Sequence, residues 1–234
     1  MPDLLRTLLA LATLAAAAAS ARAEGMVQLT LRGVTEEGGR VELEIGARNQ
    51  GGETREVDLT MHVGPHTRAH DVVALLEMRL RRADFRVLAP APDERRAHLF
   101  VEDVLFVRLR LGHGLMGTVT ASEEAPSALR LVSPDAQAEP LELSFTATTL
   151  HPHSGERGQR SLEIELEGHE SAAQISDRLF KLALANQWVA ERPHSDSWRL
   201  VKSTDGALVQ GLTVALKSWG DWRLELEFPA DDGR

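Results

Sequence analysis

The chain has 234 residues and a formal net charge of −9, with 26 lysines and arginines against 35 aspartates and glutamates. This acidic balance argues against nonspecific binding to nucleic acid or to an anionic membrane, because neutralising phosphate groups requires clustered cations. Cysteine is absent, which excludes a disulfide framework and lipid attachment through a thiol.

Residues 1–23 have the features of an export signal. Arg6 gives a weakly positive start, and the run from Leu8 to Ala19 is apolar but too short to span a bilayer. Ala21-Arg22-Ala23 supplies the small-x-small pattern of a cleavage site. We therefore expect a signal peptide over 1–23 and a mature chain that starts at Glu24, is periplasmic or secreted, and carries no membrane span.

The first half of the chain predicts strands followed by one helix. Apolar and polar residues alternate over 27–31, 41–45 and 56–63, with Gly- and Asn-rich turns between them, which is typical of antiparallel strands with one buried face. Ala69, Val72, Leu76, Leu80 and Ala83 then form a helical stripe within 67–83, closed by Phe85. Shorter strands are expected at 86–89, 98–101, 104–111, 116–121 and 129–132.

The second half repeats this pattern 103 residues later. Ala172, Ile175, Leu179, Ala183 and Asn186 form the matching stripe, closed by Trp188. Ser171 and Gln174 have the spacing of a capping box at the start of that helix. Strands are expected at 141–149, 161–167, 188–190, 198–202, 208–218 and 222–228.

The repeat predicts an α+β fold of two tandem duplicated modules. Each module is expected to be a small antiparallel sheet with one helix packed on a face, because the helix has no other surface against which to bury its stripe. The modules would span 24–132 and 141–234. Residues 133–140 contain two prolines and no periodicity, and they are the expected linker.

Two histidine pairs are candidate metal ligands. His66 and His70 have the i, i+4 spacing that begins a zinc site on a helix, although His66 would lie before the first turn if Thr67 caps the helix. His151 and His153 flank a proline in a loop and could bind Cu(II), Ni(II) or Zn(II). Neither pair has an evident third ligand, so a solvated helix start and an adventitious loop pair are the favoured interpretations, and no cofactor is expected.

Catalysis has little support in the sequence. It contains no Gly-x-Ser-x-Gly elbow and no thiol, so no catalytic residue is assigned. Glu163, Glu165 and Glu167 alternate with apolar residues, as on the solvated face of a strand, although a glycosidase could conceal two carboxylates in such a background. We therefore favour a protein that is not an enzyme.

The one cationic cluster consists of Arg79, Arg81, Arg82 and Arg86, with Arg95 and Arg96. Within it, Arg79, Arg82 and Arg86 are three to four residues apart and share a face of the first helix. The second half has no matching set and carries the acidic strand at 161–167 instead. A solvated helix face is the simplest interpretation. The alternative is a complementary contact, either between the two modules or between chains.

All four tryptophans lie in the second half. Trp188 and Trp198 occupy positions that predict core packing. Trp219 and Trp222 flank Gly220-Asp221, and a two-residue turn there would make them a cross-strand pair at a hairpin tip. Indole packing within the hairpin is one interpretation, and an exposed aromatic platform for a partner is the other.

The sequence thus favours an exported, non-enzymatic binding or assembly module with a protein or glycan partner. The candidate binding residues are Trp219, Trp222, Arg79, Arg82 and Arg86. The alternative is a metal-binding protein or metal-dependent hydrolase that uses His66 and His70, or His151 and His153. Self-association through open sheet edges is a further expectation.

Overall fold

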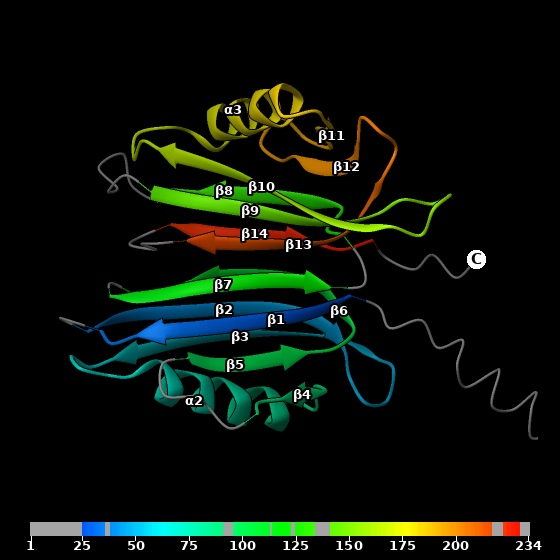
Figure 1. The fold of residues 1–234 in the computed structure, drawn as a ribbon. Coiled ribbons are helices and arrows are strands. Elements are labelled where there is room, and N and C mark those ends of the chain that lie inside the picture. Colours follow the sequence, from blue (N-terminus) through cyan, green and yellow to red (C-terminus); the bar gives the residue numbers. More distant parts are fainter. Residues whose placement is uncertain are drawn as a thin grey trace, which may run out of the picture.

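The computed structural model describes residues 25–35, 38–90, 96–112, 114–122, 125–133, 141–216 and 222–229. Of these, 57% are in strands and 15% in two helices. The strands form two sheets that lie one behind the other in Figure 1, with α2 below them and α3 above. Within the described ranges, no helix is long and apolar enough to cross a membrane.

The elements of the first half, in chain order, are β1 (Met26–Gly33), β2 (Gly39–Arg48), β3 (Thr54–Val63), α2 (Ala69–Arg82), β4 (Val87–Leu88), β5 (Arg96–Val101), β6 (Val104–Arg110) and β7 (Leu115–Ser122). β8 (Ala128–Val132) ends the first half, and the second half contains β9 (Leu141–Leu150), β10 (Arg157–Leu166), α3 (Ala172–Ala185), β11 (Trp188–Glu191), β12 (Arg199–Ser203), β13 (Leu208–Leu216) and β14 (Arg223–Glu227).

Both sheets are antiparallel. The large sheet has nine strands, with β10-β9-β13-β7-β1-β5-β4 as its main path, and β12 joins β13 and carries β11. The small sheet has five strands in the order β3-β2-β6-β14-β8. An isolated bridge between Leu129 and Trp198 links the small sheet to the residue just before β12.

The predicted fold class, α+β with two tandem duplicated modules, is wrong. Each sheet contains strands from both halves of the chain, since β7 pairs with β13 in the large sheet and β6 pairs with β14 in the small one. One hydrophobic cluster extends through both sheets and both helices. The protein is a mostly β, two-layered sandwich. A period of two identifies the buried face of a strand but not its neighbour, so the error lay in pairing each strand within its own half.

The 103-residue offset nevertheless describes the positions of elements. Helices α2 and α3 have 14 residues each and begin 103 positions apart, as do β3 and β10. Each strand of the small sheet, in the order β3-β2-β6-β14-β8, lies about one repeat length along the chain from the strand at the same place in the order β10-β9-β13-β7-β1 of the large sheet. Two strands that the repeat relates therefore belong to different sheets. The linker expected at 133–140 stays a prediction, because residues 134–140 lie outside the described part of the chain. The expected signal segment 1–23 also lies outside it and stays a prediction.

The helices close opposite ends of the sandwich. Helix α2 packs against β1, β3, β4 and β5, and α3 packs against β8, β10 and β11. The capping box at α3 is confirmed, since the Ser171 amide donates to Gln174 Oε1 at 2.8 Å and the Gln174 amide donates to Ser171 Oγ at 3.3 Å. At α2 the cap position is occupied by Arg68 and not by Thr67, and the Arg68 amide donates to Asp71 Oδ2 at 3.4 Å.

Candidate functional site

Of the two interpretations of Trp222, the exposed aromatic platform is excluded by its burial. The side chain of Trp222 is only 1% exposed, which makes it a core residue. Trp219 lies outside the described residues. Burial supports the interpretation in which Trp222 packs inside the fold, because a ring with no accessible face cannot stack on a ligand.

Arg79 and Arg82 are exposed on α2, and Arg86 follows the helix and forms an ion pair with Asp103 at 3.0 Å. The acidic residues of β10 lie at the opposite edge of the large sheet from β4 and β5, against which α2 packs. Figure 1 shows this separation, with α2 at the bottom and β10 near the top. Among the described residues, the alternative interpretation of a contact between these arginines and the acidic strand within one chain is therefore not realised.

The histidine pairs lack further ligands in the described part of the chain, and His151 is half-buried. His66 has a positive φ of 62° and precedes α2, while His70 Nε2 lies 3.2 Å from Asp71 Oδ1. The rings of His151 and His153 are 5.9 Å apart between centroids. No group of three or more potential ligands from His, Cys, Asp and Glu occurs within the described ranges.

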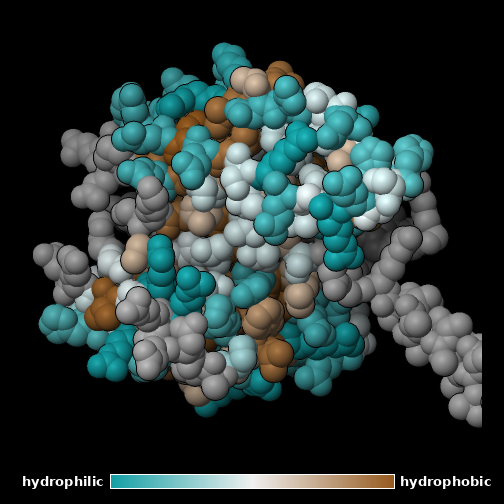
Figure 2. All heavy atoms as spheres, in the orientation of Figure 1, coloured by the Kyte–Doolittle hydropathy of each residue, from teal (hydrophilic) through white to brown (hydrophobic). Residues whose placement is uncertain are grey.

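The outer face of the large sheet carries a continuous array of hydrogen-bonding side chains. Register places residues of successive strands side by side in rows across this face, and most have short hydroxyl or amide side chains. One row is Gln28, Thr120, Thr213, Thr146 and Ser161; the next is Thr30, Thr118, Ala215, Ser144 and Glu163. In Figure 2, pale side chains of near-neutral hydropathy cover the middle of this face.

Hydrogen bonds tie neighbours of this array together. Thr120 Oγ1 and Thr213 Oγ1 are 3.1 Å apart, and Thr146 Oγ1 and Ser161 Oγ are 2.9 Å apart. A hydroxyl can both donate and accept, so each of these groups keeps capacity for a ligand hydroxyl. The face is thus polar, and its hydroxyl groups can form many hydrogen bonds with a ligand.

A groove of about 520 Å³ crosses one end of this face. Its floor includes Thr118, Ala215 and Ser144, whose short side chains leave the space open. None of the described residues that line it is aromatic. The remaining lining residues are Thr30, Arg32, Arg96, Met116, Gly117, Glu142, Leu143, Glu163, Ile164, Glu165 and Leu216.

Charge is divided between the two ends of the groove. Arg32 on β1 and Arg96 on β5 lie directly opposite each other in register at one end. Glu142 on β9 and Glu165 on β10 are likewise paired at the other end, with Glu163 beside them. The short side chains of β7 and β13 lie between these two groups.

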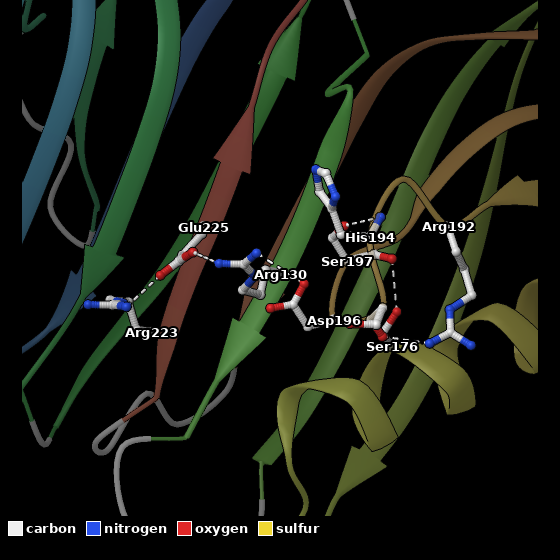
Figure 3. Close-up of polar contacts among 9 residues, drawn as sticks. Arg130, Ser176, Arg192, His194, Asp196, Ser197, Arg223 and Glu225 are labelled. Carbon is white, nitrogen blue, oxygen red and sulfur yellow. Dashed lines mark hydrogen bonds and ion pairs between the residues drawn. The ribbon is translucent and has the colours of Figure 1, made fainter.

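The outer face of the small sheet is chemically different, because its charges are largely paired with one another. Glu225 is only 5% exposed and lies between Arg130 Nη1 at 3.2 Å and Arg223 Nη2 at 2.6 Å, and Arg130 also contacts Asp196 at 3.0 Å (Figure 3). Arg108 pairs with Glu44 further along the sheet. A ligand there would have to compete with existing ion pairs.

A second hollow, of about 610 Å³, lies beside the β11–β12 hairpin. Its guanidinium groups are also engaged: Arg192 contacts Asp177 and the Ser195 carbonyl, and Arg199 binds Glu191. Figure 3 shows Arg192 directed toward α3. Arg32 in the groove on the large sheet is exposed and has no ion-pair partner among the described residues, so this groove is the better candidate for ligand binding.

Sequence reasoning missed the groove. Its residues occupy the polar positions of alternating strands, which a single sequence does not distinguish from an ordinary solvated face. The available signal was the hydroxyl-rich composition of 116–122 and 144–149, whose significance depends on β7 and β9 both lying beside β13.

No family model and no curated protein matches this chain. Among solved structures, the flagellar cap protein FliD of Helicobacter pylori is 12% identical with a TM-score of 0.23, covering 85% of this chain and 58% of its own. Carbohydrate-binding modules of the β-sandwich superfamily are 9% identical with a TM-score of 0.26, covering 89% of this chain and 93% of theirs.

Carbohydrate-binding and catalytic modules of a Clostridium thermocellum xylanase, solved with xylohexaose, are 7% identical with a TM-score of 0.22, covering 62% of this chain and 24% of theirs. The chain thus spans about 58% of the flagellar cap chain and 24% of the xylanase chain. At these TM-scores the likenesses establish neither a family nor a function.

Proposed function

We propose that the protein is a non-enzymatic binding module that holds a linear glycan in the groove on the outer face of the large sheet. The observation that carries this proposal is an open groove with a hydroxyl-bearing floor and charged hydrogen-bonding groups at both ends. A sugar chain presents hydroxyls at regular intervals, and hydroxyl, guanidinium and carboxylate side chains can each pair with them.

The lining predicts modest affinity. Aromatic rings supply much of the contact area in many binding sites, and none of the described lining residues is aromatic. Binding would depend on many hydrogen bonds, each with a net contribution of only about 0.5–1.5 kcal/mol. We therefore expect binding of long polymers that contact the whole groove and little binding of single sugars.

The acidic residues of the groove act as binding groups in this proposal. Glu142, Glu163 and Glu165 lie together at one end of the groove, whereas the opposite end is lined by Arg32 and Arg96. A carboxylate accepts hydrogen bonds from sugar hydroxyls, so these residues would orient the end of the sugar chain that lies over them.

The proposal is tested by replacing a small residue of the floor. Ala215→Trp places an indole in the groove, so it should weaken binding to a polysaccharide panel in affinity electrophoresis by about tenfold or more. Thr60→Trp, on the exposed edge strand β3 of the small sheet, is the matched control and should bind as the wild type does. Wild-type strength in Ala215→Trp, or no binding of any polysaccharide by the wild type, would overturn the proposal.

Export is part of the same proposal, because a glycan-binding module acts where extracellular or envelope glycans occur. Its support is the apolar segment and the Ala21-Arg22-Ala23 pattern. N-terminal sequencing of protein from the native host should give a mature chain that starts at Glu24. Recovery of an intact Met1 from the cytoplasm would contradict it.

A further inference from the structure

The groove separates opposite charges by several strands, which bears on the kind of glycan it takes; this inference rests on the proposed function. From Arg32 on β1 the sheet passes through β7, β13 and β9 before reaching Glu163 and Glu165 on β10. At about 4.8 Å per strand, four spacings put the two ends roughly 19 Å apart.

This separation makes the two ends act independently on a ligand. The Debye length at physiological ionic strength is about 8 Å, less than half of the span. Within the described residues, Arg32, Glu163 and Glu165 are exposed and have no ion-pair partner. Each end therefore presents its own charge to whatever lies over it.

Uniformly charged polymers fit this pattern poorly. A polyanion would gain contacts at Arg32 and Arg96 but would be repelled at Glu142, Glu163 and Glu165. A polycation would gain contacts at the acidic end and would be repelled at Arg32 and Arg96. The described lining residues between the two ends, such as Thr118 and Ser144, are uncharged and do not change this balance.

We propose that the groove selects a zwitterionic glycan, one that carries anionic and cationic groups on the same chain. The chain would lie across the strands, with an anionic group at Arg32 and Arg96 and an ammonium group at Glu163 and Glu165. Guanidinium–carboxylate pairing favours the first contact, and carboxylate–ammonium pairing favours the second.

Three polymers with the same backbone test this selection at mildly acid pH. Carboxymethyl chitosan carries both charges, carboxymethyl chitin carries mainly the anion, and chitosan carries only the cation. Because each exposed ion pair contributes little, loss of the contact at Arg32, or of those at Glu163 and Glu165, should weaken binding about fivefold. Carboxymethyl chitosan should bind most tightly, and added salt should reduce its advantage.

A charge reversal provides the sharper test. The double variant Glu163→Lys/Glu165→Lys makes both ends basic and should shift the preference to carboxymethyl chitin. The matched control is Glu56→Lys/Asp58→Lys, the same change at the same spacing on β3, and it should keep the wild-type preference.

The outcomes separate this inference from the proposed function. If the wild type binds all three polymers equally while Ala215→Trp removes binding, the groove is the binding site and the charge selection is overturned. The charge selection is also overturned if Glu163→Lys/Glu165→Lys leaves the preference unchanged. If the wild type binds no polysaccharide at all, the proposed function itself fails.

Discussion

Phe145 and Trp198 meet edge to face, with ring centroids 5.0 Å apart and planes at 88°. Phe145 belongs to β9 of the large sheet, and the Trp198 backbone exchanges hydrogen bonds of 2.8 and 3.0 Å with Leu129 of β8 in the small sheet. The ring pair therefore joins the two layers of the sandwich. Both side chains are at most 1% exposed.

Removal of the Phe145 ring should strongly destabilise the fold. Phe145→Ala leaves a cavity beside Trp198, and such truncations typically cost about 3–5 kcal/mol. Urea unfolding followed by tryptophan fluorescence would measure the loss. Phe100→Ala, on the outer face of the same sheet and only half-buried, should cost clearly less. Equal losses for the two variants would contradict the packing described here.

The carboxylate of Glu225 should contribute more to stability than that of Glu44. Both glutamates face outward on the small sheet and pair with arginine, but Glu225 is 5% exposed and Glu44 has a side chain that is 34% exposed. Glu225→Gln should cost about 1–3 kcal/mol because Arg130 and Arg223 lose a shared partner. Glu44→Gln should cost less than about 1 kcal/mol. Equal free energies of unfolding would count against this ranking.

Asp205 gives a pH-dependent prediction. Hydrogen bonds from the Ser203 hydroxyl and the Ala207 amide lower the pKa of the Asp205 carboxyl below its ordinary value of 3.8. The stabilisation is therefore present above the pKa of the unfolded chain and is lost as the pH falls through the folded pKa. The stability difference between wild type and Asp205→Asn should shrink on acidification, and Ser203→Ala should show part of the same effect. A difference that grows in acid would contradict this assignment.

The two halves of the chain should not fold separately. Residues 25–133 expressed alone would lack β13 and β14, which pair with β7 and β6 in the whole chain. Residues 141–234 expressed alone would lack β7 and β6. We expect each fragment to lack cooperative thermal unfolding when followed by circular dichroism. A sharp transition in either fragment would show that a half forms its own core.

Sequence patterns predicted elements far better than their partners. The period-two strands and the Ser171–Gln174 capping box are confirmed, and so are the helix stripes up to their last positions, because these signals depend on local backbone geometry. The last position of each stripe is wrong: Ala83 and Asn186 are the C-caps of the two helices, and Asn186 is exposed. Pairing of β7 with β13 depends on contacts between residues more than 90 positions apart, which no local period encodes. Trp222 illustrates the consequence for the site: its lack of a counterpart in the first half suggested a binding role, yet it is buried.

The proposed binding site is tested best by comparing the binding of carboxymethyl chitosan to Ala215→Trp, Thr60→Trp and the wild type. We predict that isothermal titration will show a loss of about tenfold or more for Ala215→Trp and no change for Thr60→Trp. Equal affinity of all three proteins, with each still folded, would show that the outer face of the large sheet is not where the ligand binds.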